Sequence, residues 1–339
     1  MTTPVALAVD GGNSKTDLAV VDADGELLAL VRGGASSPHH LGLGGALDVL
    51  DALRLEALGQ AGVGAALPAA AALFMAGVDF RSEQAELERA VAESHWAPLV
   101  TVENDTFAVL RAGSERGWGV AVTCGAGINC VGVSPTGRVA RFPALGAITG
   151  DWGGGYDVGL AALSAAARGA DGRGPRTSLE RSVPAYFGLR SPLELGERIH
   201  RGRIPIRRVV ELAPVVLREA EFDLAAREIV SRLAAEIVAL VRAVVARLAL
   251  SREPFDVVLG GGLLEAGDPR LLEPIEAGLS ELHPRADVRR AEAPPIVGSA
   301  FAALDLLSAP PAAYDRVRGR LPQQSAADEE GAAPVLEGR

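Results

Sequence analysis

A repeated pattern of strand, glycine bend, strand, turn and strand limits the possible folds of this chain more than any other feature. Residues 5–32 follow this pattern, and residues 119–142, which read GVAVTCGAGINCVGVSPTGRVARF, follow it again. The bend and turn glycines lie 13 positions apart in the first copy (Gly12 and Gly25) and 12 apart in the second (Gly125 and Gly137). A supersecondary unit repeated at this distance indicates two domains of similar topology.

The segments between and after the two copies predict helices alternating with buried strands. Residues 42–62 and 221–250 carry apolar side chains at helical spacing. Residues 71–79 begin with a buried strand that reaches a loop at Gly77, and residues 255–267 begin with a buried strand followed by three glycines and a helix. The sequence therefore predicts an α/β fold. Its expected parts are a first domain over 1–117, a second over 118–308 whose last helix, 293–307, can pack back on the first, and a disordered tail over 309–339.

Composition restricts the partners of the chain. The 339 residues have a formal net charge of −10, which argues against nucleic-acid or anionic-membrane partners because both require a basic surface. The two cysteines cannot form a disulfide framework, and the N-terminus lacks the pattern of a secretory signal, so the cytoplasm is the expected location. Lys15 is the only lysine, and its place in a glycine-containing bend favours a phosphate contact.

Four glycine bends stand at the ends of predicted strands, at 11–12, 125–127, 153–155 and 260–262. Glycine lets backbone N–H groups approach an anion without a Cβ in the way. Two such bends from a duplicated hairpin could hold the phosphates of one nucleotide from both sides. The bend at 260–262 opens a predicted helix and could receive the nucleoside.

Six motifs in their order along the chain carry a resemblance to a known family. They are Asp-Gly-Gly-x-Ser-Lys-Thr at 10–16, Asn-Asp-Thr at 104–106, Cys-Gly-Ala-Gly-Ile-Asn at 124–129, Gly-Asp-x-Gly at 150–153, Gly-Gly-Gly at 260–262 and Pro-Pro-Ile-Val-Gly at 294–298. The chain resembles the BadF/BadG/BcrA/BcrD-type ATPase family of the sugar kinase–Hsp70–actin superfamily, and within it the N-acetylglucosamine kinases. The resemblance implies two actin-like (ribonuclease H-like) domains with a nucleotide cleft between them.

The resemblance also implies a role for each motif in an ATP- and magnesium-dependent sugar kinase. Asp105 would be the general base that takes a proton from the sugar hydroxyl, and Asp10 would hold Mg²⁺. The phosphates would lie on Gly11, Gly12, Asn13, Ser14, Lys15 and Thr16 and on Gly125, Ala126 and Gly127. The adenosine would lie by Gly260, Gly261 and Gly262. The sugar would contact Asn104, Asn129 and Asp151, with His39 or His40 lining its pocket. A homodimer is expected on the same ground.

Some of these residues also have a simpler interpretation. Asp105 could cap its helix, since Asp is a favoured N-cap residue. His39 and His40 could lie in an ordinary loop, and Cys124 and Cys130 are most simply small strand residues.

The chain departs from the family pattern on the acceptor side. Gly-Asp-Trp-Gly-Gly stands at 150–154 where the kinases have Gly-Asp-Glu-Gly-Ser, and Ser-Ser-Pro-His-His at 36–40 replaces an asparagine-containing loop. Phe142 and Leu145 stand where animal enzymes have cysteine and tryptophan. ATP use is therefore better supported by the sequence than the identity of the sugar.

Two other functions compete with a sugar kinase. The family includes ATPases that activate 2-hydroxyacyl-CoA dehydratases or reductases through an iron–sulfur cluster, but both cysteines lie in the predicted second phosphate hairpin. A nucleotide- or sugar-binding regulator would fit a chain that lacks Asp105.

Overall fold

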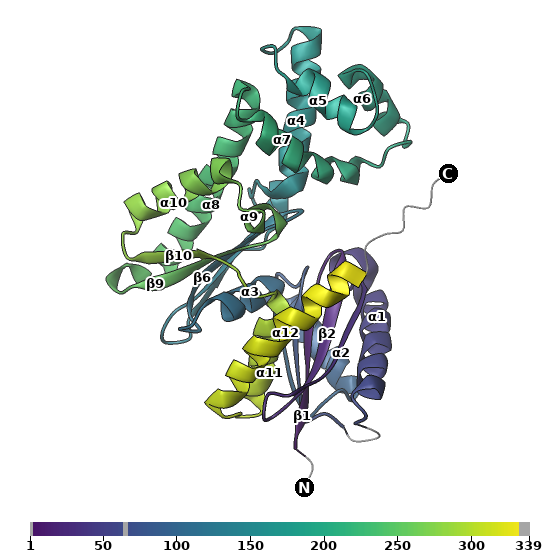
Figure 1. The fold of residues 1–339 in the computed structure, drawn as a ribbon, viewed down its shortest axis with the longest axis vertical. Helices are drawn as coiled ribbons and strands as arrows, with labels where there is room; N and C mark the ends of the chain where they lie inside the picture. The colour runs from purple at the N-terminus through teal and green to yellow at the C-terminus, as the bar shows by residue number, and fades with distance from the viewer. Residues whose placement is uncertain (1–2, 64–66, 332–339) are drawn as a thin grey trace. The chain divides into compact units, whose positions relative to one another are not determined.

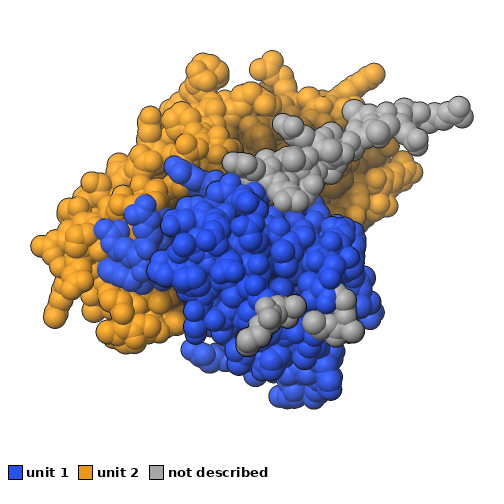
Figure 2. All heavy atoms as spheres, turned by 60° about the horizontal axis from the view of Figure 1, so that its bottom comes forward, with its two compact units in different colours: residues 1–118, 291–339 blue, residues 119–290 orange. Residues whose placement is uncertain are grey.

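The computed structural model describes residues 3–63 and 67–331, with the side chains of 322–331 excepted. The chain forms two compact units, one of residues 1–118 together with 291–339, the other of residues 119–290 (Figures 1 and 2). Each unit contains one five-stranded sheet. We describe each unit by itself.

The sheet of the first unit has the strand order β3-β2-β1-β4-β5. Its strands are β1 (Val5–Gly11), β2 (Lys15–Asp22), β3 (Leu27–Gly34), β4 (Ala70–Met75) and β5 (Leu99–Asn104). The first three strands form an antiparallel meander, whereas β4 and β5 run parallel to β1. The parallel pairing brings the carboxyl ends of β1, β4 and β5 to one edge.

The sheet of the second unit repeats this topology with the order β10-β9-β6-β7-β8. Its strands are β6 (Gly119–Cys124), β7 (Ile128–Val133), β8 (Val139–Arg141), β9 (Phe255–Gly260) and β10 (Ala286–Arg290). Again an antiparallel meander of three strands is followed by two strands parallel to its first. The predicted repeat of the hairpin and the two-domain α/β fold are both confirmed.

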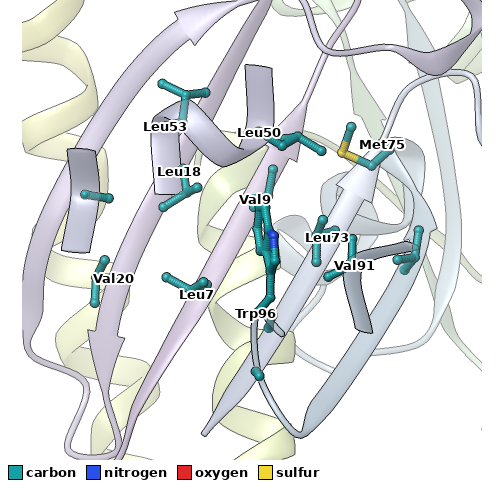
Figure 3. Packing of buried hydrophobic residues seen from close by; sticks show 14 of the residues in the cluster. Leu7, Val9, Leu18, Val20, Leu50, Leu53, Leu73, Met75, Val91 and Trp96 are labelled. Carbon is teal, nitrogen blue, oxygen red and sulfur yellow. The ribbon is translucent and has the colours of Figure 1, made fainter. Parts of the chain in front are cut away.

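Helices cover both faces of the first sheet. Helices α1 (Pro38–Gln60) and α2 (Arg81–Glu93) cover one face, and α3 (Asp105–Gly113), α11 (Pro295–Leu306) and α12 (Pro311–Gly331) cover the other (Figure 1). On the α1–α2 face the alternate residues of the strands are large and buried, and Trp96 lies among Leu7, Val9 and Leu73 (Figure 3). Successive side chains of a strand point to opposite faces of the sheet, so every second residue of a strand contributes to this core.

The second unit carries α4 (Gly154–Asp171), α5 (Leu179–Tyr186), α6 (Pro192–His200), α7 (Ala213–Glu219), α8 (Leu224–Leu248), α9 (Gly262–Glu265) and α10 (Pro269–Leu282). Helix α8 packs along β6, β7 and β8, and α10 packs on α8. Three short 3₁₀ segments, 146–148, 206–212 and 250–252, join these elements. In the described part of the chain, no helix is both long enough and apolar enough to span a bilayer.

Two expectations about the C-terminal region are corrected by the structure. The second unit ends at residue 290, not 308, because the apolar face of α11 packs on β1, β4 and α3 of the first unit. The expected disordered tail contains α12, in which Ala313, Val317 and Leu321 are buried. These residues recur every fourth position and form a narrow apolar stripe on one side of the helix. The segment is polar on average, so its composition does not indicate this stripe. Residues 332–339 of that tail lie outside the described residues.

Candidate active site

The carboxyl ends of the parallel strands of the first unit bring Asp10 and Asp105 to the same edge. Gly11 pairs in register with Met75, and Met75 pairs in register with Asn104. Asp10 is the penultimate residue of β1, and Asp105 begins α3 directly after β5. Both carboxyl-bearing residues are partly exposed, so a ligand at this edge can reach them.

A tight turn joins β1 and β2 at this edge. The N–H of Gly12 donates to the carbonyl of Lys15 over 2.9 Å, and a Cβ on residue 12 would lie 2.8 Å from that oxygen. The turn therefore excludes side chains at its first position. Asn13, Ser14 and Lys15 are exposed on it, as an anion-binding turn requires.

The two ends of the predicted phosphate segment lie inside the protein. A Cβ on Gly11 would lie 2.4 Å from Sδ of Met75. The hydroxyl of Thr16 is buried, 2.8 Å from the carbonyl oxygen of Gly34 and 2.7 Å from Oγ of Ser36. The side chain of Thr16 thus ties the turn to the segment after β3.

A row of charged residues crosses the first three strands beside the turn, and sequence reasoning identified only its first member. Asp10 lies opposite Asp17, which lies opposite Arg32. The guanidinium of Arg32 binds the carboxylate of Asp17 in a bidentate pair with N···O distances of 2.6 and 2.9 Å. Burial, with Asp105 and Asp17 as further causes, raises the pKa of Asp10 to about 8. In the ligand-free protein the carboxyl group of Asp10 is therefore largely protonated at neutral pH, and a cation bound beside it would favour its ionised form.

Helix α3 presents Asp105 without using it as the N-cap. That role belongs to Asn104, whose Oδ1 accepts the N–H of Thr106 at 3.0 Å. Burial raises the pKa of Asp105 to about 6, while the N–H of Thr106 opposes this shift. The carboxylate is consequently a stronger base than an ordinary Asp and is still ionised at neutral pH.

Asn104 itself is 2% exposed and serves the local structure. Besides capping α3, it donates through Nδ2 to Oδ1 of Asp79 at 2.9 Å. Asp79 follows β4, and its N–H donates to Oε2 of Glu83 at 2.9 Å. Asn104 therefore joins the segment after β4 to the start of α3.

His39 and His40 lie in the first turn of α1, not in a loop, and both are exposed. A Cβ on Gly77 would lie 2.6 Å from Oγ of Ser37 and 2.8 Å from Cβ of His39. Gly77 has φ +77° and follows β4. The start of α1 thus packs against the same edge of the sheet that carries Asp105.

In the second unit the structure brings three of the predicted glycine bends together. Thr123 of β6 pairs with Gly260 of β9, so both strands end at one edge. The carbonyls of Gly125 and Ala126 accept the N–H groups of Gly155 and Tyr156 at the start of α4, at 2.8 and 2.9 Å. The bends at 125–127 and 153–155 are therefore one hydrogen-bonded structure.

Glycine is required where these bends touch. A Cβ on Gly154, which has φ +78°, would lie 2.5 Å from the backbone of Gly127. A Cβ on Gly261, with φ +87°, would lie 2.7 Å from the backbone of Cys124. Gly262 has open space around it, while Ala126 and Gly127 are exposed. Oε1 of Glu265, another residue not identified from the sequence, accepts the N–H of Gly261 at 2.9 Å.

The predicted sugar contacts of the second unit are partly exposed. Oδ1 of Asn129, on β7, accepts the N–H of Cys130 at 2.7 Å. The N–H of Asp151 donates to the carbonyl of Gly146 at 3.0 Å, and its carboxylate accepts the hydroxyl of Thr149. Both residues are therefore held by hydrogen bonds to residues close to them in the chain.

The raised pKa of Asp105 predicts that this residue destabilises the ligand-free protein above pH 6. Between the unfolded pKa of 3.8 and the folded value of about 6, the folded state binds more protons, so stability falls as pH rises. Asp105→Asn is expected to increase the unfolding free energy at pH 8 by about 1–3 kcal/mol, with the gain lost below pH 4. Urea unfolding at both pH values, without nucleotide or metal, measures this. An equal gain at both pH values would contradict it.

The fold and site together define the class of ATPases built from two ribonuclease H-like units, each with glycine turns at the carboxyl edge of its sheet. A model of the BadF/BadG/BcrA/BcrD ATPase family matches residues 7–303, and the chain belongs to this family. The family predicted from the motifs is confirmed.

Curated relatives and a solved structure agree with this assignment. An N-acetylmuramic acid/N-acetylglucosamine kinase of Clostridium acetobutylicum is 30% identical over 259 residues, which cover 76% of this chain and 85% of the relative. An N-acetyl-D-glucosamine kinase of Dictyostelium discoideum is 24% identical over 317 residues, covering 90% and 99%. The structure of a candidate N-acetylglucosamine kinase from Chromobacterium violaceum has a TM-score of 0.70 at 24% identity, with 90% and 99% covered.

Proposed function

We propose that this chain is an ATP-dependent kinase that phosphorylates a hydroxyl of N-acetylglucosamine or a related amino sugar, with Asp105 as the general base. The observation that carries the proposal is the edge of the first sheet, where Asp105, a partly exposed residue whose carboxyl group has a raised pKa, lies at the same edge as the turn at residues 12–15. The kinase activities named for the two curated relatives support the substrate class.

The proposed roles follow from what each group can do. Asp105 accepts the proton of the attacking hydroxyl, which is typically worth about 10²–10⁴-fold in rate. The exposed turn residues Asn13, Ser14 and Lys15 bind the terminal phosphates, and Lys15 offsets their charge. The glycine bends of the second unit bind the rest of the nucleotide, with Gly261 and Gly262 at the adenosine.

The residues present fit a magnesium ion. Mg²⁺ in phosphate-binding sites usually keeps several waters and takes one or two protein carboxylates beside the phosphate oxygens. Asp10 offers such a carboxylate: burial first, and then Asp105 and Asp17, raise its pKa, and a bound cation would stabilise its ionised form. The ion would neutralise phosphate charge.

On the acceptor side, Asp151, Asn129 and His39 are proposed to contact the sugar, with His40 beside it. The side-chain amide of Asn104 already binds Asp79 and the N–H of Thr106. We therefore favour a role for Asn104 in orienting Asp105 over direct contact with the sugar. A homodimer and a cytoplasmic location remain predictions from the sequence.

The cysteines disfavour the alternative of an iron–sulfur activator ATPase. Cys124 and Cys130 are buried in β6 and β7, and burial raises the pKa of both thiols. A cluster needs accessible thiolates. Among the residues that the structure describes, no group of three or more His, Cys, Asp or Glu side chains could hold a metal by itself.

A substrate panel tests the proposal. Coupled ADP release is measured with Mg²⁺-ATP and hexoses, free amino sugars, N-acetylglucosamine, N-acetylmannosamine and N-acetylmuramic acid, and the phosphorylated product is identified by mass spectrometry. We expect sugar-dependent turnover with at least one N-acetylated sugar. ADP release that no sugar stimulates would overturn the proposal.

The pH dependence of turnover gives an independent prediction. Because the base must be ionised and the pKa of Asp105 is about 6, kcat/KM should be level above pH 7 and fall below pH 6, approaching tenfold per pH unit. Initial rates from pH 5 to 9 at saturating Mg²⁺-ATP measure this. A rate that is unchanged down to pH 5 would remove Asp105 from the proton transfer.

A further inference from the structure

Helices α11 and α3 touch backbone to backbone at one glycine. A Cβ on Gly298 would lie 2.0 Å from the carbonyl oxygen of Ala108 and 3.0 Å from its Cα. Gly298 is the last residue of the Pro-Pro-Ile-Val-Gly motif, to which the proposed function assigns no role. Ala108 is buried and lies three residues, less than one helical turn, after Asp105.

Helix α11 is itself fixed to the strand that carries Asp10. It packs on β1, β2 and β4, as well as on α3. Residues on this face of the central strands, such as Ala6, Ala8 and Ala72, are small and fully buried, which lets the helix approach the sheet closely. A helix anchored on β1 that contacts α3 at Gly298 relates the position of Asp105 to that of Asp10.

A second contact holds the far end of α3. The guanidinium of Arg111 lies 3.1 Å from Oδ1 of Asp305 on α11, and it stacks over the rings of Phe301 and Tyr314. The hydroxyl of Tyr314, on α12, donates to the same Asp305 oxygen at 2.6 Å. The middle and the C-terminal part of the short helix are therefore held against α11.

We propose that Gly298 is a positioning residue, which sets the height of α3 above the sheet and so places the carboxylate of Asp105 for proton transfer. This inference rests on the proposed function of Asp105. A methyl group at residue 298 meets a backbone carbonyl that cannot rotate away, so α3 must move by about 1 Å to restore van der Waals contact. A misplacement of this size at a reacting group can cost about 10²-fold in rate.

The test substitutes Gly298→Ala, with Gly319→Ala as its matched control. Gly319 also lies in a helix of the first unit, but a Cβ there meets nothing within 4 Å. Gly298→Ala should lower kcat by about 10²-fold, leave KM for ATP within about threefold and shift the acid limb of the pH profile. Gly319→Ala should match the wild type. A folded Gly298→Ala protein with wild-type kcat and pH profile would overturn the proposal.

Two further measurements keep the test decisive. Hydrogen exchange of the amides of residues 105–112 should be faster in Gly298→Ala than in Gly319→Ala, and unchanged exchange contradicts the proposal even if the wild type phosphorylates no sugar. If Gly298→Ala does not fold, Asp305→Asn, which weakens the contacts of Asp305 with Arg111 and Tyr314 at the far end of α3, should lower kcat by about two- to tenfold without changing KM for ATP. An unchanged kcat in that variant would count against the proposal.

Discussion

Asp105→Asn is expected to lower kcat by about 10²–10⁴-fold while ATP binding stays within about twofold of the wild type. The amide has nearly the shape of the carboxylate but cannot accept the proton of the sugar hydroxyl. Asp105 lies at the start of α3, and the N-cap hydrogen bond of that helix is made by Asn104, so the substitution leaves the cap intact. Coupled ADP release and a fluorescent-nucleotide titration measure the two quantities.

The matched control for this variant is Asp48→Asn. Asp48 is exposed on α1. Asp48→Asn therefore removes the same charge as Asp105→Asn but changes nothing at the edge of the sheet. Control and wild type should have the same kcat. Undiminished turnover by Asp105→Asn would exclude this residue as the base, and a parallel loss of ATP binding would point to a damaged nucleotide site.

Gly261→Ala is expected to reduce the unfolding free energy by about 2–6 kcal/mol and to weaken ATP binding at least about tenfold. At φ +87° and ψ 149° the residue occupies a backbone region that is essentially restricted to glycine, which costs about 1–3 kcal/mol for other residues. The added Cβ would also stand 2.7 Å from the backbone of Cys124, and such overpacking typically costs about 1–3 kcal/mol. Urea unfolding and nucleotide titration report the two effects.

Gly262→Ala serves as the control because it makes the same change at the next residue. A Cβ there meets nothing within 4 Å, and the residue begins α9, so stability should be unchanged or slightly higher. Equal effects of the two substitutions would show that backbone strain and the contact with Cys124 do not set the conformation of this bend.

The sequence predicted the local elements of the site well. Asp10 at a strand end, Asp105 between a strand and a helix, and glycine bends after β1, β6 and β9 all occur where the pattern places them. These features depend on the period of the side chains and on the conformations that glycine allows, and both can be read from neighbouring residues. The motif at 294–298 could also be found, but nothing local shows that Gly298 touches Ala108.

Other features depended on distant contacts: the last helix packs back on the first unit as expected, but the boundary at 308 and the disordered tail were wrong. The final helices return to the first unit because the faces that bury them, such as Ala6 and Ala8, lie almost 300 residues earlier. Thr16 and Asn104 match phosphate- and sugar-binding motifs, yet their side chains are buried in hydrogen bonds with Ser36 and Asp79.

The sequence alone determined the two ribonuclease H-like sheets and the glycine bends, since strand alternation and left-handed backbone are local properties. Only the tertiary structure decided which ends meet at one edge, which motif residues stay exposed, and how strongly Asp10 and Asp105 hold their protons. Strand pairing brings distant segments into register, and desolvation is the sum over all atoms around a carboxylate, so neither can be read from the residues beside it.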